Sequence, residues 1–126
     1  MIEIWKDIPG YEHLYQVSNY GKVMRLAHGN KREKLLKQSV VTHGYFAVHL
    51  FKNKIKKQIA VHRIVALTFL DNPERKQQVN HKDGNKQNNN VENLEWVTAY
   101  ENIHHAIDLK YEKYKNRIAD IYKEEK

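Results

Sequence analysis

One stretch in the second half of the chain constrains the fold more than any other part, because its pattern changes several times over a short distance. Residues 77–80 have extended character, Asp83-Gly84-Asn85 is typical of a turn, and residues 93–97 again favour a strand. Thr98 is a good helix N-cap, and Glu101 stands three residues later, as in a capping box. The stretch therefore predicts a strand, a long loop, a second strand and a helix.

The start of the chain predicts a small β-structure. Residues 5–23 alternate β-prone residues with turn formers, which favours short strands around a turn at residues 19–21. Residues 30–34 are charged and predict a loop.

A second group of strands is expected after this loop. Residues 39–41 and 45–51 should form an antiparallel hairpin, with Gly44 suited to the turn between them. Residues 53–54 then turn the chain into residues 58–61, so that three strands form one sheet with a lysine-bearing, solvated edge.

Two helices are predicted, one short and one long. From His62 the apolar residues follow helical spacing, and Asn72-Pro73 ends this short core helix. The long final helix could fold back on the core or pair with a second copy, which leaves a monomer and a homodimer both open. Its apolar stripe consists of Ile103, Ile107, Tyr111, Tyr114, Ile118 and Ile121.

Composition narrows the classes of protein and site. With 126 residues the chain has room for one compact domain with an appended arm, and no apolar run is long enough to cross a bilayer. We expect a soluble, cytoplasmic protein of a bacterial or phage-infected cell, without a membrane partner. Because the chain has no cysteine, any metal must be held by His, Asn, Asp or Glu. The net charge of +7 favours a polyanionic partner.

Three motifs carry a resemblance to a known family: Val61-His62-Arg63, residues 79–85 (VNHKDGN) and residues 91–98 (VENLEWVT). Residues 61–106 resemble the HNH endonucleases of phages and mobile introns. Residues 4–26 resemble the small nuclease-associated modular domain that often precedes them.

The resemblance implies an α+β fold. It would consist of an N-terminal antiparallel sheet module (1–36), a ββα-metal (His-Me finger) nuclease core (37–108) and a C-terminal helical extension (109–126). Relatives often carry a further helix-turn-helix module, for which residues 107–126 leave no room. We therefore expect a reduced endonuclease, a fragment of a longer one or a phage packaging accessory.

The resemblance also implies a catalytic site. His81 matches the general base, and Asn93 matches the central asparagine that orients the base. Asn102 matches a ligand of one divalent ion, Mg²⁺ or Mn²⁺. Asn80 matches a position that is often an acidic metal ligand in relatives, and its neutral side chain is the main departure from the family pattern.

Other roles stay open for several residues. Asn93 could be purely a loop clamp, and Asp83 could bind metal, although Asp before Gly more often hydrogen-bonds its own turn. His104 or His105 could add a ligand. His62 favours a structural role at the start of the core helix, and Trp96 is most simply a core residue.

Double-stranded DNA is the expected substrate, cut in one or both strands by His81 with the metal ion. The alternative is a DNA-binding module with impaired catalysis. Lysines 52, 54, 56 and 57 would lie at a hairpin tip, where they could either grip phosphates or solvate a sheet edge. The full set of expected DNA contacts is Lys52, Lys54, Lys56, Lys57, Lys82, Lys86 and Arg63.

Overall fold

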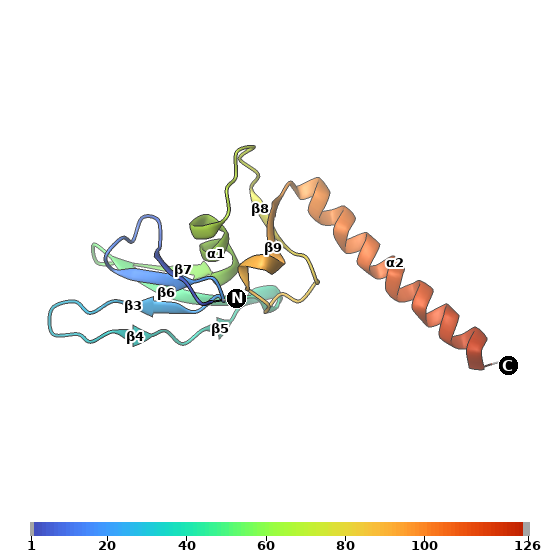
Figure 1. Cartoon of the computed structure of the whole chain (residues 1–126), viewed down its shortest axis with the longest axis horizontal. Helices are drawn as coiled ribbons and strands as arrows, with labels where there is room; N and C mark the ends of the chain where they lie inside the picture. The colour runs from blue at the N-terminus through green and yellow to red at the C-terminus, as the bar shows by residue number, and fades with distance from the viewer. Residues whose placement is uncertain (1, 125–126) are drawn as a thin grey trace.

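A computed structural model describes the backbone of residues 2–124, and the side chains within this range except those of residues 114 and 117–124. Within these residues the fold is α+β, as predicted, with antiparallel sheets and two α-helices (Figure 1). The sheets and α1 gather at one end of the molecule, and α2 extends away from them.

The first sheet has the strand order β1-β2-β3-β4. Its strands are β1 (Trp5–Asp7), β2 (Tyr15–Ser18), β3 (Val23–Arg25) and β4 (Lys34–Leu35). The predicted turn between β2 and β3 is confirmed, and Gly21 in it has a φ of +86° that favours glycine. The sequence did not predict β4, because two exposed residues show no periodicity. Backbone pairing of Met24 with Leu35 forms this strand.

The second sheet confirms the predicted three-stranded arrangement. It consists of β5 (Ser39–Val40), β6 (Phe46–Lys52) and β7 (Ile55–Ala60), with β6 in the middle. The 3₁₀ turn Thr42–Gly44 joins β5 to β6. Asn53 and Lys54 both have positive φ angles, as a tight turn between twisted strands requires.

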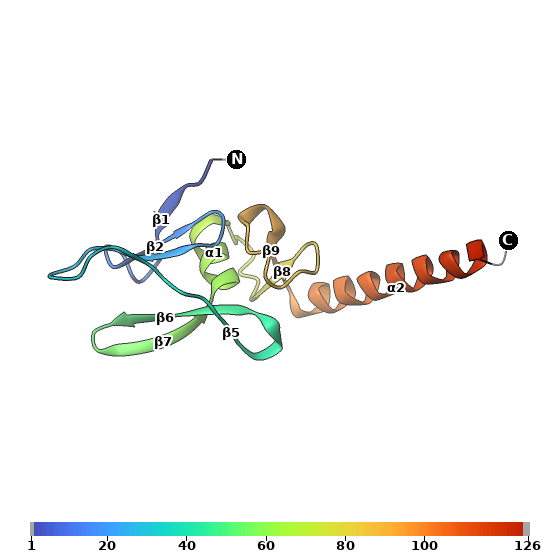
Figure 2. The same cartoon turned by 90° about the horizontal axis from the view of Figure 1, so that it is seen from below.

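Helix α1 (Val61–Phe69) follows β7 directly and lies at the centre of the core. It contacts β2 of the first sheet, β6 and β7 of the second, and the strands β8 and β9 that follow (Figure 2). Val17 and Val23 from the first sheet, Leu50 from the second and Ile64 from α1 belong to one continuous buried cluster. The two parts of the chain therefore share a single hydrophobic core, and the division at residues 36–37 stays a prediction about the sequence.

The strand, loop, strand and helix pattern is confirmed as β8 (Gln78–His81), the 3₁₀ turn Val91–Asn93, β9 (Leu94–Val97) and α2 (Ala99–Glu124). Strands β8 and β9 pair antiparallel, with His81 opposite Leu94. The capping box is also present, since Thr98 Oγ1 accepts from the Glu101 backbone N–H and Glu101 Oε1 accepts from that of Thr98.

Helix α2 contacts β8 and β9 and then leaves the rest of the molecule (Figures 1 and 2). Ile103, Ile107 and Tyr111 of the apolar stripe are more than half exposed, so this part of the helix does not fold back on the core. The side chains of Tyr114, Ile118 and Ile121 lie outside the described residues, and pairing with a second copy stays a prediction. Neither helix in the described part of the chain has the length and apolar content needed to cross a bilayer.

Candidate active site

A cavity lies between β8, the loop that follows it and the first turns of α2. Three of the four expected catalytic and metal-binding residues, Asn80, His81 and Asn102, line this cavity. The other lining residues are Tyr45, Val79, Gly84, Lys86, Ile103, His105, Ala106 and Leu109. The antiparallel pairing of β8 and the capped start of α2 bring these parts of the chain together, as the ββα pattern predicts.

His81 is the last residue of β8 and is 5% exposed. Its Nε2 atom lies 2.8 Å from Oδ1 of Asn89, which is also buried. The ring centroids of Tyr45 and His62 lie 5.9 Å and 5.1 Å from that of His81. The imidazole is thus held by one hydrogen bond and two flanking rings, while it still borders the cavity.

Asn93 clamps the loop between β8 and β9. Its Nδ2 donates to Asp83 Oδ1 and to the Asn88 carbonyl, both at 2.9 Å, and its Oδ1 accepts from the Asp83 backbone N–H. Its carbonyl accepts from the Lys82 backbone N–H. These contacts fit the loop-clamp alternative, and the expected role of Asn93 in orienting His81 stays a prediction.

Asn89, the hydrogen-bond partner of the His81 ring, was not predicted from the sequence. The only signal was the run of three asparagines at positions 88–90. Composition shows that such a loop is rich in amide groups, but it does not show which of the three side chains folds inward.

Asp83 uses both carboxylate oxygens within the loop. Oδ1 accepts from the Asn85 backbone N–H and from Asn93, and Oδ2 accepts from Asn88 Nδ2. The hydrogen bond from Asn88, followed by that from the Asn85 backbone, holds the pKa of Asp83 below its usual value. The turn interpretation of Asp83 therefore has direct support, in preference to metal binding.

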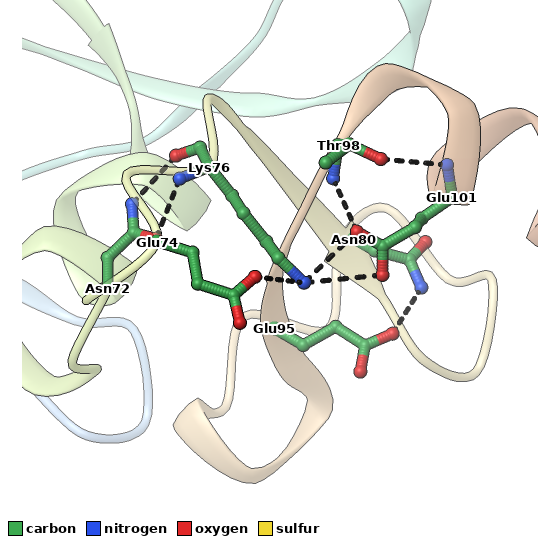
Figure 3. A network of polar contacts seen from close by, with 7 residues as sticks. All are labelled: Asn72, Glu74, Lys76, Asn80, Glu95, Thr98 and Glu101. Atoms are coloured by element: carbon green, nitrogen blue, oxygen red, sulfur yellow. Dashed lines mark hydrogen bonds and ion pairs between the residues drawn. The ribbon is translucent and has the colours of Figure 1, made fainter.

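Asn80 and Asn102 both have their amide nitrogens engaged. Asn80 Nδ2 donates to Glu95 Oε1, and Asn102 Nδ2 donates to Gln78 Oε1, each at 2.9 Å (Figure 3 shows the Asn80 pair). The amide oxygens are thus the groups that these two residues can offer to the cavity. Amide oxygens are hard donors of the kind that Mg²⁺ and Mn²⁺ accept, so the donor set fits such an ion.

These donors would bind a cation weakly on their own. In the part of the chain that the structure describes, no three His, Asp and Glu side chains form a group that could hold a metal. His105 lines the same cavity, and its Nε2 atom is buried without a hydrogen-bond partner. The possible extra ligand from the helix is therefore His105, and its role stays a prediction.

A polar network fixes the start of α2, which carries Asn102. Lys76 Nζ lies 3.0 Å from Glu101 Oε1 and 3.6 Å from Glu74 Oε2, and Asn72 holds the Lys76 backbone (Figure 3). The segment before β8 is thereby tied to the capping box of α2. The network anchors the first turn of the helix beside the site.

His62 forms part of the wall behind His81. Burial is the main cause that lowers the pKa of His62 to about 4, with smaller electrostatic contributions from the neighbouring His81 and Arg63. Its ring centroid lies 4.7 Å from that of Tyr45. His62 is therefore neutral near pH 7 and serves as a packed ring, in agreement with the structural role expected for it. Trp96 is partly buried against the core, as expected.

The residues expected to contact DNA fall into two groups. Three of them donate hydrogen bonds to backbone carbonyls within the protein: Lys52 Nζ donates to the Gly10 carbonyl, Lys86 Nζ to that of His43, and Arg63 to that of Gln77. The others have exposed side chains, and they are Lys54, Lys56, Lys57 and Lys82. The β6–β7 hairpin tip is thus a lysine-rich surface that a polyanion can reach.

Comparison with known proteins finds two family matches in the chain. Residues 3–51 match the NUMOD4 motif, and residues 60–104 match the family described as HNH endonuclease. The uncharacterized HNH endonuclease L247 of Acanthamoeba polyphaga mimivirus is 50% identical over an alignment of 111 residues, and the match covers 84% of the present chain and 26% of that protein.

Two further matches involve an endonuclease studied with DNA. The DNA endonuclease I-HmuI of Bacillus phage SP01 is 46% identical over 99 residues, which make up 79% of the present chain and 55% of that protein. A solved structure on DNA binding and cleavage by the HNH homing endonuclease I-HmuI matches with a TM-score of 0.76 and 40% identity, over 94% of the present chain and 67% of that one. The chain spans about half or less of the length of these curated relatives.

Proposed function

Because the chain belongs to the HNH endonuclease family and is similar to phage homing endonucleases, we propose that it hydrolyses phosphodiester bonds of double-stranded DNA with the help of one divalent metal ion. The observation that carries the proposal is the buried His81, held by Asn89 on the edge of a cavity that Asn80 and Asn102 also line. The same cavity thus offers a proton acceptor and hard oxygen donors.

His81 would act as the general base. A neutral imidazole with one nitrogen engaged by a protein acceptor presents the lone pair of its other nitrogen, which can take a proton from water near neutral pH. The rings of Tyr45 and His62 restrict the orientation of the imidazole. Little reorientation would then be needed when the substrate binds, which lowers the entropic cost of reaction.

Asn80 and Asn102 would hold the cation, Mg²⁺ or Mn²⁺, through their amide oxygens. When bound, the ion supplies Lewis-acid stabilisation of the scissile phosphate and of the leaving oxygen. Because two neutral ligands hold a hard cation weakly, the DNA phosphate and water would complete the coordination. Metal affinity should therefore rise when DNA is bound.

The exposed lysines would position the duplex without reading its sequence. Lys54, Lys56 and Lys57 project from one hairpin, and Lys82 follows His81 directly. Contacts from lysine to phosphate supply affinity and register, whereas sequence specificity needs contacts to base edges. We therefore assign these residues to phosphate binding.

The rival function is a DNA-binding module with impaired catalysis. One observation favours it: Asn80 replaces an acidic ligand, and its amide nitrogen is engaged by Glu95. Plasmid relaxation separates the two functions. We expect nicked or linear product from supercoiled plasmid in Mg²⁺ or Mn²⁺ and none in EDTA. Plasmid retardation in a gel without any cleavage in either metal would instead support the binding module.

A further inference from the structure

We propose that the turn between β2 and β3 of the first sheet is a structural part of the nuclease site, because it supports Asn89, and that Asn89 is the residue that positions His81. The functional consequence rests on the proposed DNA hydrolysis. The positioning itself is a property of the protein without substrate. The three contacts that carry the inference run from the turn, through Asn89, to the imidazole.

The first contact is the hydrogen bond between Asn89 and His81. Both residues are about 95% buried, so water does not compete for this bond, and the atoms that face each other are Asn89 Oδ1 and His81 Nε2 at 2.8 Å. A carbonyl oxygen can only accept, so Nε2 carries the hydrogen in the neutral ring. The lone pair is then on Nδ1, and a single tautomer is selected for the reaction.

The second contact joins Asn89 to the N-terminal sheet. Gly21 is buried in the β2–β3 turn, and a Cβ atom added to it would lie 2.9 Å from Asn89 Cβ and 3.0 Å from the Asn89 carbonyl oxygen. The turn backbone therefore lies directly against the backbone of Asn89. Only a glycine leaves room for this approach, and its φ of +86° makes any other residue strained as well.

The third contact anchors the loop just after Asn89, at Val91. The Val91 backbone N–H donates to the Asn19 carbonyl at 2.8 Å. The Asn19 side chain in turn accepts from the Ile4 backbone N–H and donates to the Ile2 carbonyl. Gln38 Nε2 donates to the Gly21 carbonyl at 2.7 Å, which ties the turn to the segment before β5. The β2–β3 turn that packs against Asn89 is thus itself held by several hydrogen bonds.

The test of the Asn89 contact uses two variants and a readout that needs no activity. Nitrogen-15 NMR of the imidazole groups, with His81 assigned by comparison with His81→Gln, reports which ring nitrogen carries the hydrogen. We expect one tautomer, protonated on Nε2, in the wild type and in Asn89→Asp, which keeps an acceptor. We expect a mixture in Asn89→Leu, which has similar volume and no acceptor. An unchanged tautomer in folded Asn89→Leu would overturn the proposal.

The kinetic arm measures multiple-turnover cleavage of a duplex over a range of DNA concentrations, which gives kcat and KM. Misplacement of a catalytic group by about 1 Å can cost on the order of a hundredfold in rate, so we expect a loss of that order in kcat for Asn89→Leu, with KM for DNA unchanged. Asn89→Asp should retain most of the rate. If Asn89 were only structural, both variants would lose stability and their kcat values would not differ in this way. That result would contradict the assignment.

Two glycines of the N-terminal sheet region provide a matched pair for the turn. Gly10 has a φ of +85°, close to that of Gly21, but a Cβ added to it would meet nothing within 4 Å. Gly10→Ala therefore imposes similar backbone strain without the contact. We expect Gly21→Ala to lower kcat and mix the His81 tautomers, and Gly10→Ala to do neither.

If the two glycine variants have the same kcat and the same His81 tautomer, the turn is not part of the site. Should Gly21→Ala not fold, Gln38→Ala loosens the same turn by removing the donor to its carbonyl, and unchanged tautomer and kcat in that variant would have the same meaning. If the wild type cleaves no DNA, the proposed hydrolysis fails, whereas the NMR result still decides whether Asn89 positions His81.

Discussion

At the scale of single residues, Asn80 shows how the site can depart from an acidic ligand and remain suited to a cation. Its amide nitrogen donates to the Glu95 carboxylate at 2.9 Å, and this leaves the amide oxygen for the cavity. An aspartate at this position would place two carboxylates in contact, and one of them would be driven to take up a proton. The neutral side chain at position 80 is therefore explained by its neighbour across the β8–β9 pair.

This arrangement predicts that the effect of an acid at position 80 depends on Glu95. The double variant Asn80→Asp, Glu95→Gln should lower the Mg²⁺ concentration that half-saturates cleavage, because a carboxylate binds a hard cation better than an amide does. Asn80→Asp alone should give a smaller decrease, and Glu95→Gln alone serves as the control. An unchanged Mg²⁺ requirement in the folded double variant would mean that Asn80 is structural.

His62 predicts a pH dependence of stability. Its pKa is lowered from 6.5 to about 4 in the folded protein, so between these values the unfolded chain binds a proton that the folded chain does not. The contribution of His62 is fully present above pH 6.5 and is lost as the pH falls towards 4. Urea unfolding of the wild type and His62→Gln at pH 7 and pH 5 should show the larger decrease for the wild type. Equal decreases would show that His62 titrates normally in the fold.

The residues of the site were only partly predictable from the sequence. The resemblance to the HNH endonucleases predicted that Asn80, His81 and Asn102 form one site, and the structure brings them to one cavity. Asn89 was missed because three successive asparagines look alike, and the one that is buried packs against Gly21, in a distant part of the chain. Such a long-range steric contact leaves no local pattern.

At the scale of elements, the β6–β7 hairpin presents its lysines unequally. Lys52 Nζ donates to the Gly10 carbonyl at 2.6 Å and lies 5.9 Å from the centre of the Tyr11 ring, so it is tied to the loop between β1 and β2. Lys54 lies in the turn and Lys57 in β7, and both are exposed. These two lysines are the better probes of a contact with DNA.

The hairpin hypothesis predicts a change in the salt dependence of DNA binding. Each lost phosphate contact lowers the slope of log affinity against log salt by close to one unit, so Lys54→Ala with Lys57→Ala should flatten it by roughly one to two units. Binding titrations in Ca²⁺, which suppresses cutting, measure this slope. Lys82→Ala with Lys86→Ala removes the same charge beside the cavity. Flattening by the second pair alone would exclude the hairpin from the path of the DNA.

Elements were most predictable where capping and turn residues coincide with a change in periodicity. Thr98 and Glu101 correctly marked the start of α2, and Gly44 the turn before β6. Strand β4 was missed because it has only two residues and depends on pairing with β3. The apolar stripe of α2 did not predict where the helix lies, since a stripe fits any apolar partner and Ile103 and Ile107 remain exposed.

At the scale of the whole molecule, the two family matches do not correspond to two independent cores. Val17 and Val23 of the NUMOD4 segment and Ile64 and Leu94 of the HNH segment lie in one buried cluster, with α1 in contact with both parts. Removal of the first segment would expose the face of α1 that packs on β2. Resemblance follows segments of the chain, whereas packing follows distance in space, so the division into modules at residues 36–37 stays a prediction.

We propose that His81 acts as the general base and that DNA binding by the chain does not depend on it. The most direct measurement compares wild type and His81→Ala by single-turnover cleavage of a duplex in Mg²⁺, with DNA affinity measured in Ca²⁺. Loss of a general base removes about two to four orders of magnitude in rate, and we predict a loss of this size with DNA affinity unchanged. Retention of more than about a tenth of the wild-type rate, in a folded variant that binds DNA normally, would contradict the assignment.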